Sequence, residues 1–132
     1  LLTGSESGFS LTPYGDWHYR ELEVFVDYLG LSPLQAINCA TEQGARALRL
    51  DGELGCLKPG YLADLLIFDG NPLDDITLLG EQSRFSHIFK DGKRVDCAAP
   101  LATSWKLPGW RVSEFSERVL TKELVQSLKE TK

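Results

Sequence analysis

The first 50 residues carry apolar side chains at helical spacing. One set predicts a helix over residues 17–29, and its members are Tyr19, Leu22, Val26 and Leu29. Asp16 stands where it would cap the start of this helix, and Gly30 stands where it would end it. Because Leu1 and Leu2 precede a glycine-flanked loop, we expect a strand end and a loop before the helix.

Two further helices are predicted from capping signals and apolar spacing. Ser32 followed by Pro33 is typical of an N-cap with proline at the first helical position. The apolar stripe expected for this helix is Leu34, Ile37 and Ala40. We expect a short third helix over residues 41–48. Its small residues should allow another element to approach closely, and they are Gly44, Ala45 and Ala47.

The middle of the chain changes to short apolar runs separated by turn residues. Lys58-Pro59-Gly60-Tyr61 is typical of a type II turn, and Asp91-Gly92 of a two-residue hairpin. Residues 63–68 are the strongest predicted strand. Its residues 65–68 are apolar on both faces, so we expect it to be covered on each side. Residues 85–90 and 93–95 are the expected hairpin strands.

The last part, residues 97–132, reads as a linker followed by an amphipathic helix. The linker carries Trp105 and Trp110, for which packing onto the domain is the simplest expectation. The helix should be capped near Ser113, and its apolar stripe is Leu120, Leu124 and Leu128.

Composition and charge restrict the possible classes of protein. With 132 residues, of which 42% are hydrophobic and 25% charged, the chain can form a globular domain with its own core. The formal net charge is −5 and the 14 basic residues are scattered, which argues against a nucleic-acid partner. No apolar run approaches the ~20 residues that span a bilayer, so we expect no membrane association and a cytoplasmic location.

Cysteine usage and the absence of methionine add two expectations. The three cysteines, Cys39, Cys56 and Cys97, have neither CxxC spacing nor histidine neighbours. This argues against a disulfide framework or a zinc knuckle, and we expect buried free thiols. The sequence contains no Met, so we expect a chain that is processed, truncated or cut from a longer reading frame.

Candidate chemistry is concentrated in the loop Gly4-Ser5-Glu6-Ser7-Gly8-Phe9, which presents one carboxylate. An acid at the carboxyl end of a strand is a common position for catalysis in α/β folds. From the residues alone, however, a solvated loop acid is the simpler interpretation of Glu6. Ser5 and Ser7 have no histidine nearby in the sequence, so loop hydrogen bonds are expected of them rather than nucleophilic attack.

Three other polar residues have simpler structural interpretations. His18 could line a substrate pocket, although a structural or surface role is the simpler expectation. His87 lies within a predicted strand, where half-buried packing is expected. Asp64 precedes an apolar strand, which favours a turn or a hydrogen bond at the end of the ladder over catalysis.

Three segments, in this order, resemble the C-terminal part of metal-dependent amidohydrolases, particularly the imidazolonepropionase-like branch. The segments are Gly4-Ser5-Glu6-Ser7-Gly8, then residues 32–36 leading into 40–45, and then residues 55–69 with Asn71-Pro72-Leu73. The resemblance implies an α/β fold that comprises the last strand and following helices of a (β/α)8 barrel, C-terminal β-sandwich strands and a terminal helix. The implied boundaries are 1–50 for the barrel end, 51–96 for the sandwich strands and 97–132 for the linker and terminal helix.

The resemblance also implies a role for Glu6. The family acid at the end of the last strand is usually Asp, which touches a divalent metal and takes a proton from the hydrolytic water. Glutamate reaches about one methylene further, so Glu6 is the implied base and a possible metal ligand. Ser7, Phe9 and His18 would line the substrate. The family's remaining ligands would precede Leu1, and neither His18 nor His87 matches them.

The resulting hypothesis is a C-terminal part of a metal-dependent hydrolase, with zinc as the implied metal. It would act on C–N bonds of non-peptide amides or cyclic amides, with a metal-activated water attacking the carbonyl and Glu6 as base. The chain alone would then be inactive, could be without a bound metal, and would need the N-terminal barrel portion as its partner. The alternative is a non-catalytic interaction or assembly module that forms a homodimer.

Overall fold

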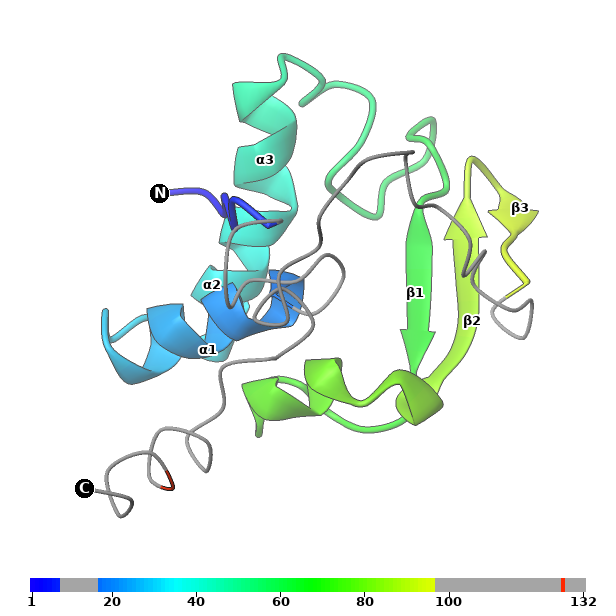
Figure 1. Ribbon diagram of the computed structural model, residues 1–132. Coiled ribbons are helices and arrows are strands. Elements are labelled where there is room, and N and C mark those ends of the chain that lie inside the picture. The colour runs from blue at the N-terminus through cyan, green and yellow to red at the C-terminus, as the bar shows by residue number, and fades with distance from the viewer. Residues whose placement is uncertain (8–16, 97–126, 128–132) are drawn as a thin grey trace, which may run out of the picture.

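The computed structural model describes residues 1–7, 17–96 and 127 of this chain. The elements are α1 (His18–Asp27), α2 (Pro33–Ala40), α3 (Glu42–Ala47), β1 (Leu65–Phe68), the 3₁₀ helices η1 (Ile76–Gly80) and η2 (Gln82–Arg84), β2 (Phe85–Lys90) and β3 (Lys93–Arg94). The three α-helices gather on one side, the sheet stands on the other, and the 3₁₀ segment connects β1 to β2 (Figure 1). The described part is therefore a mixed α/β structure with a small antiparallel sheet.

Helix α1 forms where its spacing predicts, but its buried face is different at the C-terminal end. Leu22 and Phe25 are buried, whereas Leu29, which the spacing assigned to the apolar stripe, is exposed. Gly30 ends the helix as predicted: it adopts φ +71°, and the N–H of Leu31 returns to the carbonyl of Phe25 at 3.1 Å. This reversal turns the chain before Leu29 can face the core. The predicted cap, Asp16, lies outside the described residues.

Helix α2 begins as predicted but buries a different face. Ser32 and Gln35 form a capping box, in which each side chain accepts a hydrogen bond from the other's backbone N–H. The buried residues are Ala36 and Cys39, while Leu34, which belonged to the predicted stripe, is 62% exposed. The predicted stripe is therefore wrong at Leu34 and at Ala40, which is also exposed, whereas Ile37 is half-buried and packs against the core. The buried residues of α2 are the small ones because α1 packs closely against this helix.

One core joins the helices to the segment that follows β1. Its buried members are Leu22, Phe25, Ala36, Cys39 and Ile76. Helix α1 packs against both α2 and η1, and η1 is the element that carries Ile76. The carboxylate of Asp75 caps η1 by accepting the Thr77 N–H at 2.9 Å. The core therefore fixes the link between β1 and β2 to the helical half.

Helix α3 is approached closely by another segment, as its small residues predict. Ala45 is buried, and a methyl group built on Gly55 would lie 2.8 Å from the Ala45 Cβ and 3.0 Å from the Thr41 carbonyl oxygen. Gly55 also adopts φ +89°, which L side chains rarely accept. The turn at position 55 therefore requires glycine, both for lack of space and for its backbone conformation.

The antiparallel sheet has the order β1-β2-β3 and the predicted turns. Asp91 and Gly92 both have positive φ, as a two-residue I′ hairpin requires. Gly60 has φ +88°, and the Tyr61 N–H bonds to the Lys58 carbonyl at 3.1 Å, so the type II turn is confirmed.

Cover on both sides of β1 is not found within the described residues. Leu66 is 62% exposed and Ile67 is 48% exposed. The predicted strand over residues 63–68 begins at Leu65 and pairs with β2 on one edge only. Because adjacent residues of a strand point to opposite faces, the described chain leaves an exposed apolar side chain on each face of β1 and leaves one edge of the strand unpaired.

Asp64 holds the end of this sheet, which confirms the structural interpretation of its carboxylate. It accepts hydrogen bonds from the Lys90 Nζ and, at 2.7 Å, from the Asp91 N–H. His87 is half-buried, as expected, and its ring lies parallel to that of Phe89 with centroids 6.1 Å apart. Both residues therefore make contacts within the sheet.

Free thiols are observed at Cys39, which is buried, and at Cys56, which is half-buried. No helix in residues 1–7 and 17–96 is long and apolar enough to cross a membrane. The predictions for Cys97, Trp105, Trp110 and the terminal helix concern positions outside the described residues.

We expect Gly55→Ala to destabilise the chain by about 1–3 kcal/mol, because the added methyl group overpacks against Ala45 and the backbone is strained. Urea unfolding followed by circular dichroism measures this loss. Gly52→Ala is the matched control, since a methyl group on Gly52 meets nothing within 4 Å. Equal stability of the two variants would contradict the close approach.

Acid should weaken the sheet through Asp64. The hydrogen bond from Lys90, then that from the Asp91 N–H, lowers the pKa of Asp64 below its ordinary 3.8. The unfolded chain therefore takes up the proton first, and the contribution is present above pH 3.8 and lost as pH falls through the lowered pKa. Asp64→Asn should flatten this part of the acid transition. The pKa of Asp75 is also lowered, by hydrogen bonds from the Thr77 hydroxyl and N–H. The loss of stability in acid that is due to Asp75 should therefore persist in Asp64→Asn. An acid transition identical to that of the unsubstituted chain would refute the role of Asp64.

Candidate active-site loop

Glu6 lies at the turn of the N-terminal segment with its side chain exposed. Its φ is +46°, in the left-handed region that residues other than glycine seldom adopt. The hydroxyls of Ser5 and Ser7 lie 2.7 Å apart and so connect the two residues on either side of Glu6. The serines are loop hydrogen bonders, as predicted, and they hold the backbone turn that presents the carboxylate.

Residues 1–6 form no strand in this structure. The sequence predicts a strand end here, but a strand needs a neighbour to accept its backbone hydrogen bonds. No strand within the described residues pairs with this segment. The predicted strand is therefore absent, while the turn after it is present.

Helix α1 anchors the loop through Glu21. The Gly4 N–H donates to both carboxylate oxygens of Glu21, at 2.8 Å and 3.0 Å. Sequence reasoning missed this residue because the contact spans 17 positions. The available signal was an acid in the first turn of the helix that follows the loop, where the helix dipole favours a negative charge.

The other predicted site residues are not gathered around Glu6. His18 is the first residue of α1 and is exposed, and Ser7 is half-buried. Within the described part of the chain, no hydrogen bond or ion pair joins His18 to Glu6. Phe9, the third predicted substrate-lining residue, lies outside the described residues.

The residues present do not make a metal site on their own. A protein site for a divalent metal gathers several carboxylate, imidazole or thiolate ligands. The described ranges contain no group of three or more His, Cys, Asp or Glu side chains placed to hold a metal ion. Glu6 contributes one exposed carboxylate, so a complete set would need ligands from elsewhere.

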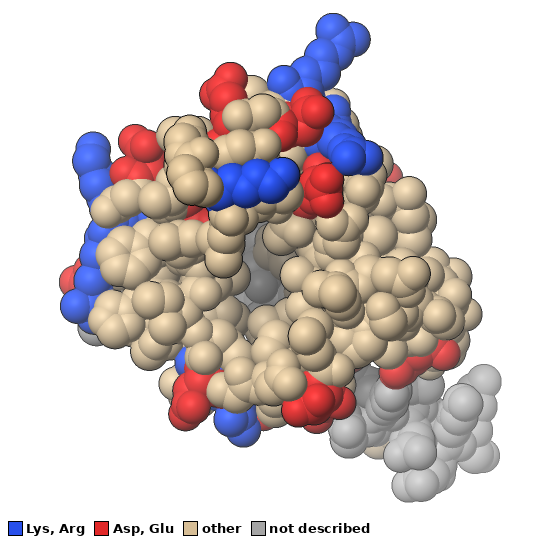
Figure 2. Space-filling model, turned by 180° about the vertical axis from the view of Figure 1, so that it is seen from behind, with Lys and Arg blue, Asp and Glu red and all other residues tan. Residues whose placement is uncertain are grey.

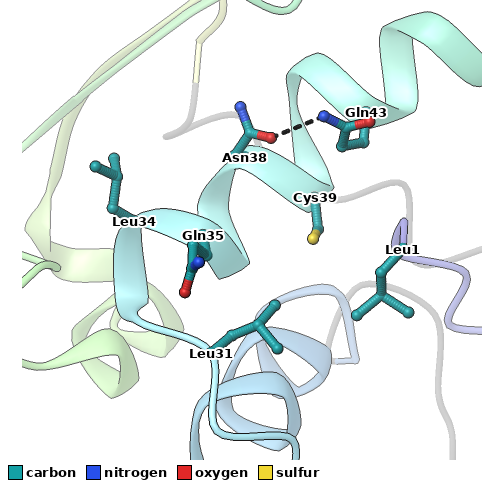
Figure 3. A pocket seen from close by; sticks show the side chains of 7 residues that line it. All are labelled: Leu1, Leu31, Leu34, Gln35, Asn38, Cys39 and Gln43. Atoms are coloured by element: carbon teal, nitrogen blue, oxygen red, sulfur yellow. Dashed lines mark hydrogen bonds between the residues drawn. The ribbon is translucent and has the colours of Figure 1, made fainter.

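A hollow of about 470 Å³ lies between the start of the chain and α2 (Figure 3). Its lining residues are Leu1, Leu31, Leu34, Gln35, Asn38, Cys39 and Gln43. Asn38 accepts a hydrogen bond from the Gln43 side chain at 3.0 Å and donates one to Glu42 at 2.8 Å. Because these amides are engaged with each other and with Glu42, the hollow presents mainly apolar surface and does not include Glu6.

The opposite side of the molecule from Figure 1 is largely uncharged. Figure 2 shows this face as mostly tan, with the basic and acidic side chains around its margin and a hollow near its centre. On this face the basic side chains lie among acidic ones. Among the predicted catalytic and metal-binding groups, the described chain therefore presents the exposed carboxylate of Glu6.

Comparison with known proteins adds a family and several relatives. The model of the amidohydrolase family matches residues 13–95. The ochratoxinase of Aspergillus niger is 36% identical over 74 residues, which are 55% of this chain and 15% of that protein. The imidazolonepropionase of Rubrobacter xylanophilus is 51% identical over 41 residues, which are 31% of this chain and 10% of that protein.

The chain is also similar to part of the solved structures of larger enzymes. The crystal structure of a Xaa-Pro dipeptidase with bound methionine superposes with a TM-score of 0.54 at 33% identity. That match covers 59% of this chain and 18% of the dipeptidase. The chain thus spans a small part of the length of each of these relatives.

Proposed function

The chain belongs to the amidohydrolase family, and on that basis we propose that it is the C-terminal part of a metal-dependent hydrolase acting on C–N bonds. Non-peptide amides or cyclic amides are the proposed substrates. The observation that supports a catalytic role is the exposed carboxylate of Glu6 on an anchored turn. The family match begins at residue 13, so the role of Glu6 rests on this loop and on its sequence motif.

Glu6 would act as the general base of the reaction. A divalent metal, for which we propose zinc, would supply a water of lowered pKa when it is bound. The Glu6 carboxylate would take the proton of the attacking water and then give it to the leaving nitrogen. An exposed glutamate can reach such a water, whereas the neighbouring serines are occupied with each other. Ser7, Phe9 and His18 remain the proposed substrate-lining residues.

The same proposal explains the local fold. We propose that residues 1–6 complete the last strand of the (β/α)8 barrel when its neighbouring strands are present. Strands β1 to β3 would belong to the β-sandwich, whose other parts would cover Leu66 and Ile67. The division into residues 1–50, 51–96 and 97–132 follows from this arrangement. The free thiols of Cys39 and Cys56 support a reducing, cytoplasmic location.

A second candidate function, an interaction or assembly module, is favoured by β1. This strand lies at the edge of the sheet and exposes two adjacent large apolar residues, Leu66 and Ile67. An open apolar edge is a template for pairing with another chain. We propose that the isolated chain covers it by forming a homodimer.

Glu6→Gln in the complete hydrolase should reduce turnover by about 10²–10⁴-fold, since the amide cannot accept the proton. Steady-state kinetics on a panel of amides and cyclic amides, combined with a thermal melt, measures the loss and checks the fold. Glu53→Gln is the matched control because Glu53 is also exposed but lies in a distant turn. Unchanged turnover in Glu6→Gln would remove the assignment of the base.

Leu66→Lys should convert a dimer of the isolated chain to a monomer, because the charge would be buried at the pairing edge. Light scattering across a concentration series measures the mass. Leu57→Lys is the control, since Leu57 is 84% exposed and lies outside the sheet. A stable monomer of the unsubstituted chain at high concentration would contradict the proposed dimer.

A further inference from the structure

We propose that Glu21 is a positioning residue that holds the loop of Glu6 in its active geometry, an inference that rests on the function proposed for Glu6. Its carboxylate receives the Gly4 N–H with both oxygens, at 2.8 Å and 3.0 Å. Gly4 lies two residues before Glu6 in the chain. A hydrogen bond from a backbone N–H to a carboxylate is charge-assisted and therefore stronger than one between neutral groups.

The loop needs such an anchor because its own contacts are few and its backbone is strained. Glu6 has positive φ, a backbone conformation that is unfavourable for a residue other than glycine. The Ser5–Ser7 contact closes the turn locally but does not attach it to the rest of the molecule. Residues 1–6 have no strand partner in the described chain. The Glu21 contact supplies the attachment.

Helix α1 is a suitable support for this carboxylate. Leu22, the next residue, is buried in the core together with Phe25. Tyr19 lies on the same helix, and a methyl group built on Gly80 of η1 would lie 2.5 Å from its ring, so α1 and η1 are in tight contact. Because these contacts restrain α1, the position of Glu21 is defined by the core. Through its hydrogen bonds to the Gly4 N–H, Glu21 then fixes the position of Gly4 and of the turn at Glu6.

Glu21 lies in the first turn of α1, and a second acid, Glu23, lies close to it on the same helix. Glu23, two residues later, is engaged differently and bonds to Arg20 at 3.1 Å within the helix. The two acids therefore provide a matched pair on one helix, and among the described residues of the loop the hydrogen bonds go to Glu21 and not to Glu23.

The test uses the complete, metal-loaded hydrolase with Glu21→Met, which keeps a long helix-forming side chain and removes the acceptor. We expect kcat to fall by about 10–100-fold with KM little changed, because displacing a catalytic group by about 1 Å has an effect of this size. Glu21→Gln should restore most of kcat, since its amide oxygen can still accept the Gly4 N–H. Glu23→Met should leave kcat unchanged.

Two further readouts separate positioning from a general structural effect. In a Glu6→Gln background, Glu21→Met should reduce kcat by less than about twofold more, because both changes act through the same group. Amide hydrogen exchange in the peptide of residues 1–7 should become faster in Glu21→Met but not in Glu23→Met. This second readout does not depend on activity.

The outcomes distinguish the two proposals. Full kcat in Glu21→Met, with turnover lost in Glu6→Gln, would overturn the positioning role alone. Equal loss in Glu21→Gln and Glu21→Met, or losses that multiply with Glu6→Gln, would also overturn it. Unchanged turnover in Glu6→Gln would instead overturn the proposed base, whatever the exchange data show.

Discussion

Close packing of α1 against α2 and η1 is the constraint on which the rest of this structure depends. It is possible because α2 presents Ala36 and Cys39 to the larger side chains Leu22 and Phe25. Small residues at a helix contact allow the backbones to approach, and buried apolar area then stabilises the pair by about 25 cal/mol per Å². Ile76 extends this core into the segment between β1 and β2. Both the candidate loop and the sheet are thus attached to one core.

Local features of the fold were predicted from the sequence because they depend on residues close together in the chain. Ser32 and Gln35 form their capping box within four residues, and Asp91-Gly92 closes the hairpin by backbone conformation alone. The buried faces were predicted less well. Leu34 has the helical spacing of a core residue, but burial depends on which surface the helix meets. That information lies in distant segments such as η1.

The candidate site shows the same division between local and distant information. The exposed carboxylate of Glu6 and the serine contacts around it follow from a short glycine-flanked sequence. The anchor at Glu21 does not, since the loop sequence gives no sign of which helix will approach it. The absence of a strand over residues 1–6 also does not follow from the local sequence, because pairing requires another strand. Sequence identified the candidate acid, and the fold identified the residue that supports it.

The two main errors in the predicted burial have one physical explanation. The apolar residues Leu34, Leu66 and Ile67 were all expected to be covered, yet all three are exposed in the described chain. An apolar pattern in a sequence reflects burial in the functional assembly, whatever chain supplies the cover. A larger hydrolase or a second copy would each provide such cover. The helical core and the turns are already formed without it, and so is the anchored loop of Glu6. Within the described residues, the exposure of these apolar side chains therefore leaves the local geometry of the acid unchanged.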